Sequence, residues 1–273
     1  MKIFNVITNA SIIPLFYEKT QIKLNVMVSY PYCNGNIHKL AVDHRHMIDK
    51  LYLDSGAFTA QKGRVTITVS EYRRYIRRYG NLFDQVFTLD DNFYNPDHNF
   101  NHQAYLEESI PDGAKRPIPV IHDEKKPFEE FEVYAEQGHD YIAIGSNKKL
   151  SDDVYERIKT KFPDIKIHLF GNLNRKILFA HKPYSADAST WVNQAGMGSI
   201  YYWDAIDKKD YLINLGGREK NDGYSSFRHK AELDSFLNEK FGYDHSRLLA
   251  DTSTRWIVNL YFFKQLEDIL NAQ

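Results

Sequence analysis

Short apolar runs of strand character alternate along this chain with amphipathic stretches, at a spacing of roughly 20 to 35 residues. Strand, helix and strand repeated in this order predict right-handed crossovers and a parallel sheet. The expected strands are 24–30, 50–53, 85–89, 118–121, 141–144, 166–170 and 184–186. Seven or eight such strands in 273 residues favour an α/β fold, the (β/α)₈ TIM barrel, over an open doubly wound sheet.

Helices are expected between most of these strands and again near the C-terminus. The expected helices are 70–80, 127–138, 151–162, 172–182, 230–240 and 252–270. The sequence therefore predicts a single domain over 1–273. Its barrel core would run to about residue 215, and a polar loop with C-terminal helices packed on the barrel would follow over about 216–273.

Composition excludes several classes of protein. Hydrophobic residues make up 42% and charged residues 26% of the chain, as in a globular protein. The net charge of -1 gives no overall signal for nucleic acid. Cys33 is the only cysteine, which excludes an intramolecular disulfide and any multi-cysteine metal site. No apolar run approaches the ~18 residues of a membrane span. We expect a cytoplasmic protein with no cofactor and no metal.

Acidic residues and a histidine follow several of the expected strands. In a parallel barrel the active site lies at these carboxyl ends. The residues are Asp54, Asp90, His122 and Asp187. Carboxylates on one rim indicate acid–base or covalent chemistry at a sugar carbon. Each residue could instead build a turn, cap a helix or be solvated. A metal site from these four is a further alternative, but no H-x-H or H-x-x-x-D pair supports it.

Two basic groups could meet phosphates. The expected helix 70–80 carries Arg73, Arg74, Arg77 and Arg78 on one face, which could equally be a solvated face. The polar loop that begins near residue 216, and the residues just after it, carry a second basic group. That group could bind a nucleic acid at the rim of the barrel, or it could simply be solvated. That group is Arg218, Lys220, Arg228 and Lys230.

Six segments, in order and spacing, resemble segments of the tRNA-guanine transglycosylases. They are LDSGAF (53–58), VFTLD (86–90), PVIH (119–122), YIAIGS (141–146), HLFG (168–171) and YSADASTW (184–191). The last segment is more similar to the phage and bacterial branch that acts on DNA, the DpdA-like 7-deazaguanine transglycosylases. The resemblance covers about residues 50 to 205.

The resemblance implies a TIM-barrel glycosyltransferase that exchanges guanine in DNA for a 7-deazaguanine such as preQ0. Asp187 would be the nucleophile that forms a covalent glycosyl-enzyme, and Asp54 the general acid and base. Asp90 would read the guanine edge. The base pocket would be lined by Ser55, Gly56, His122, Gly145 and Ser146. The implied partners are DNA and the free base, with a helper protein as an option. A virus could encode such a chain, which would then act in the host cytoplasm.

The chain departs from the family at several positions. The tRNA enzymes hold a structural zinc with three cysteines and a histidine, and this chain has no cysteine in that region. Ala57 replaces a family glycine, and His122 stands where the family has glutamine. Three alternatives stay open: a tRNA-guanine transglycosylase, a catalytically silent nucleic-acid-binding barrel, and a small-molecule glycosidase.

Overall fold

The computed structural model describes residues 1–33, 38–108, 110, 115–122, 126–145, 152–216 and 222–272. The chain divides by its internal contacts into two compact units. The first, here the barrel unit, comprises Met1–Thr8 and Asn25–Ala188. The second, here the helical unit, comprises Asn9–Leu24 and Ser189–Gln273. The single-domain organisation stays a prediction.

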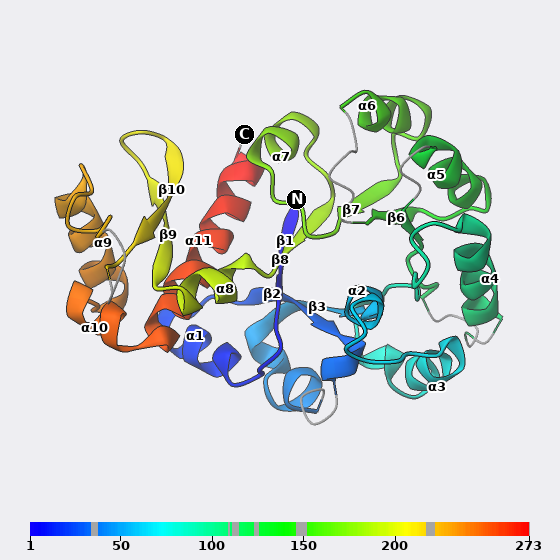
Figure 1. Cartoon of the computed structure of the whole chain (residues 1–273), viewed down its shortest axis with the longest axis horizontal. Coiled ribbons are helices and arrows are strands. Elements are labelled where there is room, and N and C mark those ends of the chain that lie inside the picture. Colours follow the sequence, from blue (N-terminus) through cyan, green and yellow to red (C-terminus); the bar gives the residue numbers. More distant parts are fainter. Residues whose placement is uncertain are drawn as a thin grey trace. The chain divides into compact units, whose positions relative to one another are not determined.

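The barrel unit is built on one sheet of eight parallel strands (Figure 1). The strands are β1 (Lys2–Val6), β2 (Leu24–Ser29), β3 (Ile48–Asp54), β4 (Gln85–Val86), β5 (Val120–Ile121), β6 (Tyr141–Ile144), β7 (Lys166–Leu169) and β8 (Ser185–Ala188). Their order is β4-β3-β2-β1-β8-β7-β6-β5. A parallel bridge between Phe87 and Ile118 joins the two ends of this order, so neighbours follow the chain around a ring. The predicted TIM-barrel fold is confirmed.

Strand β1 is absent from the strands that the sequence predicts. Its short apolar run is interrupted by Asn5, which is an unusual residue for a strand buried on both faces. Asn5 is nonetheless only 2% exposed, and its side-chain amide donates to the Asn25 carbonyl of β2 at 3.4 Å. The buried amide thus has a partner on the neighbouring strand, and β1 pairs with both β2 and β8.

Large side chains fill the inside of the ring, so the barrel interior is a packed core and not a pore. The rings of Phe4 and Tyr52 stack with their centroids 4.0 Å apart. A short polar chain runs through the same interior, because the Ser185 hydroxyl lies 2.5 Å from the Tyr141 hydroxyl and 2.6 Å from His168 Nδ1. Access for a substrate is therefore limited to the ends of the strands.

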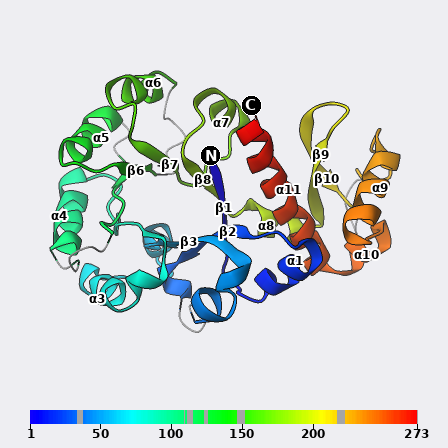
Figure 2. The same ribbon diagram turned by 180° about the vertical axis from the view of Figure 1, so that it is seen from behind.

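The helices of the barrel unit lie along the outer side of its strands, as two opposite views show for α3, α4, α5 and α6 (Figures 1 and 2). They are α2 (Ala57–Gln61), α3 (Val69–Tyr79), α4 (Pro96–Glu107), α5 (Pro127–Glu136), α6 (Asp152–Lys161) and α7 (Arg175–His181). Thr68 caps α3 in a capping box with Glu71, so this helix begins just before the expected range 70–80. Helix α4 is not predicted, because two of the three residues it buries are the polar Asn99 and Gln103.

The helical unit contains the expected C-terminal helices and an unexpected hairpin. Its elements are α1 (Ile12–Thr20), α8 (Thr190–Gly196), β9 (Ser199–Asp204), β10 (Lys209–Asn214), α9 (Lys230–Phe241), α10 (His245–Ala250) and α11 (Thr252–Ala272). The fully buried Asn259 of α11 donates to the Trp191 and Ser199 carbonyls and accepts from Tyr201 N, so it ties α11 to α8 and β9. No helix among the described residues is long and apolar enough to cross a membrane.

Candidate active site

The turn after β3 holds Asp54 and Ser55 at the end of the barrel. Gly56 has φ +84°, and a Cβ added to it would lie 2.4 Å from Cδ of Pro31. Only glycine combines this backbone conformation with this close approach. Ser55, with none of its surface exposed, donates from its hydroxyl to Asp90 Oδ1 at 3.0 Å. The ends of β3 and β4 are thereby joined by side chains.

Asp90 and His122 form a close pair across the ends of β4 and β5. His122 Nε2 lies 2.5 Å from Asp90 Oδ2, and the His122 ring stacks on Phe93 with centroids 4.0 Å apart. The ring also occupies the space where a Cβ of Gly145 would be, since such an atom would lie 2.2 Å from the ring. Asp90 and His122 are both largely buried. The imidazole is thus held in one orientation by its surroundings.

Asp187, at the end of β8, is buried and accepts a hydrogen bond from the neighbouring turn. It is 6% exposed, and its Oδ1 accepts a hydrogen bond from Gly171 N at 2.7 Å. The same oxygen lies 3.4 Å from Nε2 of the fully buried His168. These contacts give Asp187 a structural use, because they fix the turn after β7 to the end of β8.

Asp54 is the carboxyl whose ionisation is most altered. Burial, reinforced by the negative charges of Asp90 and Asp187, raises the pKa of Asp54 to about 7, and the nearby Ser29 hydroxyl opposes the rise. The residue as a whole keeps part of its surface accessible. A carboxyl with this pKa can hold or release a proton near neutral pH, which is what a general acid or base must do.

The structure brings together most of the predicted site residues. Asp54, Ser55, Gly56, Asp90, His122, Gly145 and Asp187 all lie at the carboxyl ends of the barrel strands. Ser146, Arg218 and Lys220 lie outside the described residues. Arg228 and Lys230 belong to the helical unit, where Arg228 pairs with Asp207 and Lys230 with Asp234. These two cations therefore already have acidic partners.

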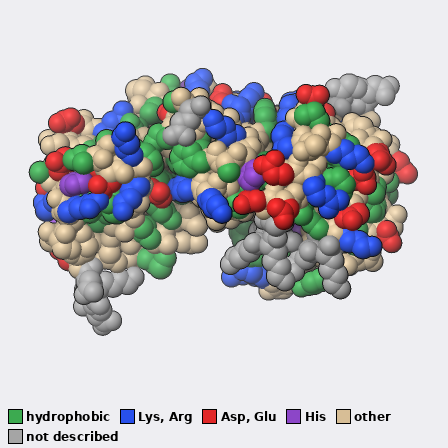
Figure 3. Space-filling model, turned by 90° about the horizontal axis from the view of Figure 1, so that it is seen from above, with side chains coloured by type: hydrophobic (Ala, Val, Ile, Leu, Met, Phe, Trp, Pro, Cys, Tyr) green, Lys and Arg blue, Asp and Glu red, His purple; other side chains and the backbone are tan. Residues whose placement is uncertain are grey.

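The charges on the described surface are mixed in sign. On the face drawn in Figure 3, basic and acidic side chains are interspersed. Arg73 of α3 lies over the ring of Tyr105, with its guanidinium 4.1 Å from the ring centroid. DNA as a partner stays a prediction. The contacts described for Arg73, Arg228 and Lys230 are made within the protein and do not test it.

Sequence reasoning missed two features near this site. One is Phe93, which stacks on the His122 ring. A single aromatic residue in a loop does not indicate in the sequence which side chain it will contact. The other is the group of Asp91, His98 and His102. The H-x-x-x-H spacing of its histidines is visible in the sequence, but it carries a signal only once 96–107 is known to be a helix.

Comparison with known proteins gives a fold but no family. No protein-family model matches the chain, and no curated protein matches it. A solved structure described as a putative fructose-1,6-biphosphate aldolase from Coccidioides immitis matches with a TM-score of 0.53 at 11% identity, over 99% of this chain and 91% of its own. A second, described as a native KDPGal structure, has a TM-score of 0.44 at 9% identity and 97% coverage of both chains. At this identity the likeness shows the barrel fold alone.

The comparison contradicts the predicted DNA guanine transglycosylase function, because a solved structure that covers 99% of this chain is described as a putative fructose-1,6-biphosphate aldolase. Nothing in the comparisons supports 7-deazaguanine exchange, DNA as substrate or a phage source. The site residues that the resemblance implies stay predictions. Asp187 shows why the motif misled: the same acid at the same strand end can be a buried hydrogen-bond acceptor.

Proposed function

We propose that the chain is an enzyme that moves protons on a small carbonyl compound, in a reaction of the aldol type. The observation that carries the proposal is the Asp54 carboxyl with its pKa raised to about 7, at the same end of the barrel as the Asp90–His122 pair. The fold supports the proposal, because barrel enzymes use this end for catalysis and one barrel of similar fold is described as a putative aldolase.

Each residue of the site has a defined task in this proposal. Ionised Asp54 takes a proton from the carbon next to the carbonyl in the aldol direction. In the retro-aldol direction it takes the proton of the β-hydroxyl, which becomes a carbonyl as the carbon–carbon bond breaks. The electron pair released moves onto the carbonyl oxygen, which receives a proton from His122. Asp90 holds the His122 ring in place, as a carboxylate does for a catalytic histidine in hydrolases.

The test is hydrogen exchange without a second substrate. The protein is incubated in D₂O with dihydroxyacetone phosphate or with pyruvate, and NMR follows the loss of the proton next to the carbonyl. We expect exchange with at least one of these probes, at a rate that rises with pH through about 7 as Asp54 ionises. Asp54→Asn should lower the rate by roughly 100-fold or more, since it removes the base.

Asp49→Asn is the matched control. Asp49 lies on the same strand as Asp54 but pairs with Lys2 at 3.1 Å, away from the site, so its neutralisation should leave the exchange rate unchanged. Two results would reject the proposal. One is exchange in Asp54→Asn within tenfold of the parent rate; the other is no exchange above buffer with either probe in a sample that is folded by circular dichroism.

A further inference from the structure

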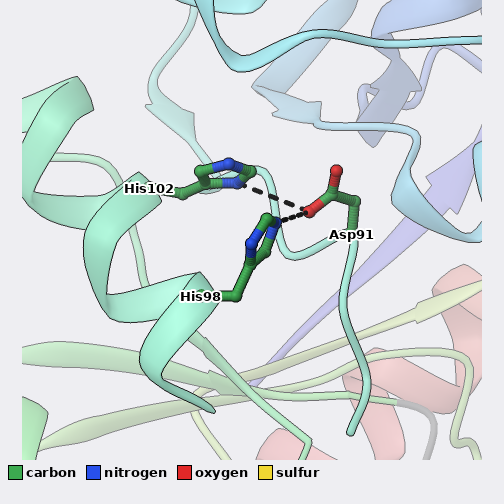
Figure 4. Close-up of side chains that lie close together, drawn as sticks. All are labelled: Asp91, His98 and His102. Carbon is green, nitrogen blue, oxygen red and sulfur yellow. Dashed lines mark hydrogen bonds and ion pairs between the residues drawn. The ribbon is translucent and has the colours of Figure 1, made fainter. Parts of the chain in front are cut away.

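Two histidines one turn apart on α4 face a carboxylate of the preceding loop (Figure 4). His98 Nε2 lies 2.8 Å from Asp91 Oδ1, and His102 Nδ1 lies 3.4 Å from the same oxygen. From this geometry we propose that Asp91, His98 and His102 bind one divalent ion of the zinc class. The proposal is independent of the proposed function, because Asp91 points to α4 while its neighbour Asp90 contacts Ser55 and His122.

The three ligand atoms are close to the spacing that a tetrahedral ion needs. Zinc bonds of 2.0–2.2 Å at tetrahedral angles separate neighbouring ligand atoms by roughly 3.3 Å. The three atoms all lie within 4.8 Å of one another, and the two distances to Asp91 Oδ1 fall on either side of that value. An ion would require His102 Nδ1 to give up its present contact with the Leu89 carbonyl, which is 3.1 Å away. Rotation of the side chains within the 4.8 Å that now separates the ligand atoms completes the site.

The loop that carries Asp91 is fixed to α4 by hydrogen bonds of its own. The Asn99 side chain, 1% exposed, donates to the Asn92 carbonyl at 2.8 Å and accepts from Asn92 N at 3.4 Å. The Asn92 side chain in turn accepts from the backbone of Tyr94 and Asn95 at 3.1 Å. Gln61 also donates to the Asp91 carbonyl, at 3.0 Å. Ligands supported in this way lose little entropy when an ion binds.

The donor set and its exposure indicate which ion would bind. Two imidazole nitrogens and one carboxylate suit zinc and its first-row neighbours, whereas magnesium and calcium prefer oxygen ligands. His102 is 14% exposed, Asp91 29% and His98 40% in their side chains, so one side of the cluster is open to water. Three protein ligands with an open position leave room for a water molecule as the fourth ligand.

A second group of similar residues, in the helical unit, gives a useful contrast. His229 Nδ1 lies 2.6 Å from Asp204 Oδ2, and Asp207 is close by at 4.0 Å. There Asp207 is already paired with Arg228, and Asp204 accepts backbone hydrogen bonds within the hairpin turn. The ion-pair partners of Asp91 among the described residues are the two histidines alone. A cation would therefore meet a carboxylate that contacts only histidines at Asp91, but one that is already paired with an arginine at Asp207.

Calorimetric titration of the metal-free protein with zinc alone tests the site. We expect one zinc per chain with a dissociation constant in the micromolar range or tighter, and no binding of magnesium under the same conditions. His102→Ala and His98→Ala should each weaken zinc binding by at least 100-fold. Asp91→Asn should weaken it by tenfold or more, although the amide can still accept hydrogen bonds from both histidines.

His181→Gln is the matched control variant. His181, the last residue of α7, contacts two carboxylates, Asp152 and Glu156, but through opposite ring nitrogens that cannot bind one ion together. Zinc binding should be unchanged in this variant.

A second measurement needs no variant and so avoids any failure to fold. Saturating zinc should protect His98 and His102 from diethyl pyrocarbonate at least tenfold, mapped by mass spectrometry, while the labelling of the exposed His38 is unaffected. Unchanged labelling of both residues, no zinc bound by the parent protein, or parent-like affinity in both histidine variants would each overturn the proposal and leave a hydrogen-bonded cluster without a metal.

Discussion

At pH 8, Asp54→Asn is expected to be more stable than the parent protein by up to about 4 kcal/mol. The folded structure raises the pKa of this carboxyl from 3.8 to about 7, so ionisation costs free energy in the folded state that it does not cost in the unfolded chain. Asparagine has nearly the same shape and cannot ionise. The substitution should therefore stabilise the fold while it removes the proposed catalytic base.

The pH dependence gives the sign of the effect. Below about pH 4 the carboxyl is protonated in both states, and parent and variant should be equally stable. Between pH 4 and 7 the unfolded chain ionises first, so the parent loses stability as the pH rises, and the full difference is present above pH 7. Urea denaturation of both proteins at pH 4 and pH 8 measures this difference. A variant less stable than the parent at pH 8 would show that ionised Asp54 is well solvated or paired.

Gly145→Ala is expected to reduce activity by roughly 100-fold or more with little change in overall fold. A Cβ at this position would lie 2.2 Å from two atoms of the His122 ring, closer than any real contact. The ring must then rotate, which breaks its 2.5 Å contact with Asp90 and its stacking on Phe93. The proton-exchange assay measures the loss, and a chemical-shift change of the His122 ring reports the movement.

Gly196→Ala provides the control for that experiment. A Cβ at Gly196 would meet no atom within 4 Å, and the residue has no positive φ. Its activity should match the parent. Equal activity of Gly145→Ala and Gly196→Ala would mean that the orientation of His122 does not matter for the reaction.

The sequence predicts the barrel well where a strand is an uninterrupted apolar run. The run 141–144 is observed with the expected bounds, and the acids after β3, β4 and β8 lie at the strand ends as predicted. Strand β1 escapes prediction because the side-chain nitrogen of the buried Asn5 finds its acceptor only on β2, 20 residues further along the chain. Helix α4 escapes because its inward face is polar. Local patterns carry no information on such partners.

The function could not be predicted from the same patterns. Aspartate after a parallel strand is favoured by the turn itself, so a series of such residues arises in barrels of different chemistry. What separates Asp54 from Asp187 is the surroundings: part of Asp54 stays accessible and its proton is held near neutral pH, whereas an oxygen of Asp187 is engaged with Gly171. Those differences depend on contacts between residues more than ten positions apart.

The closure of the ring between β4 and β5 has a consequence for motion. These two strands have two residues each, and the backbone hydrogen bonds of Thr88 N and Ile118 N cross between them at 2.9 and 2.8 Å. A short ladder of hydrogen bonds opens at lower free energy than a long one. Local opening of the barrel should therefore begin between β4 and β5. Asp90 follows β4 and His122 follows β5, and their side chains contact each other across this strand pair. Each local opening between β4 and β5 would separate the Asp90 carboxylate from the His122 imidazole. The fraction of molecules with an intact Asp90–His122 pair should therefore depend on the local stability of this one strand pair.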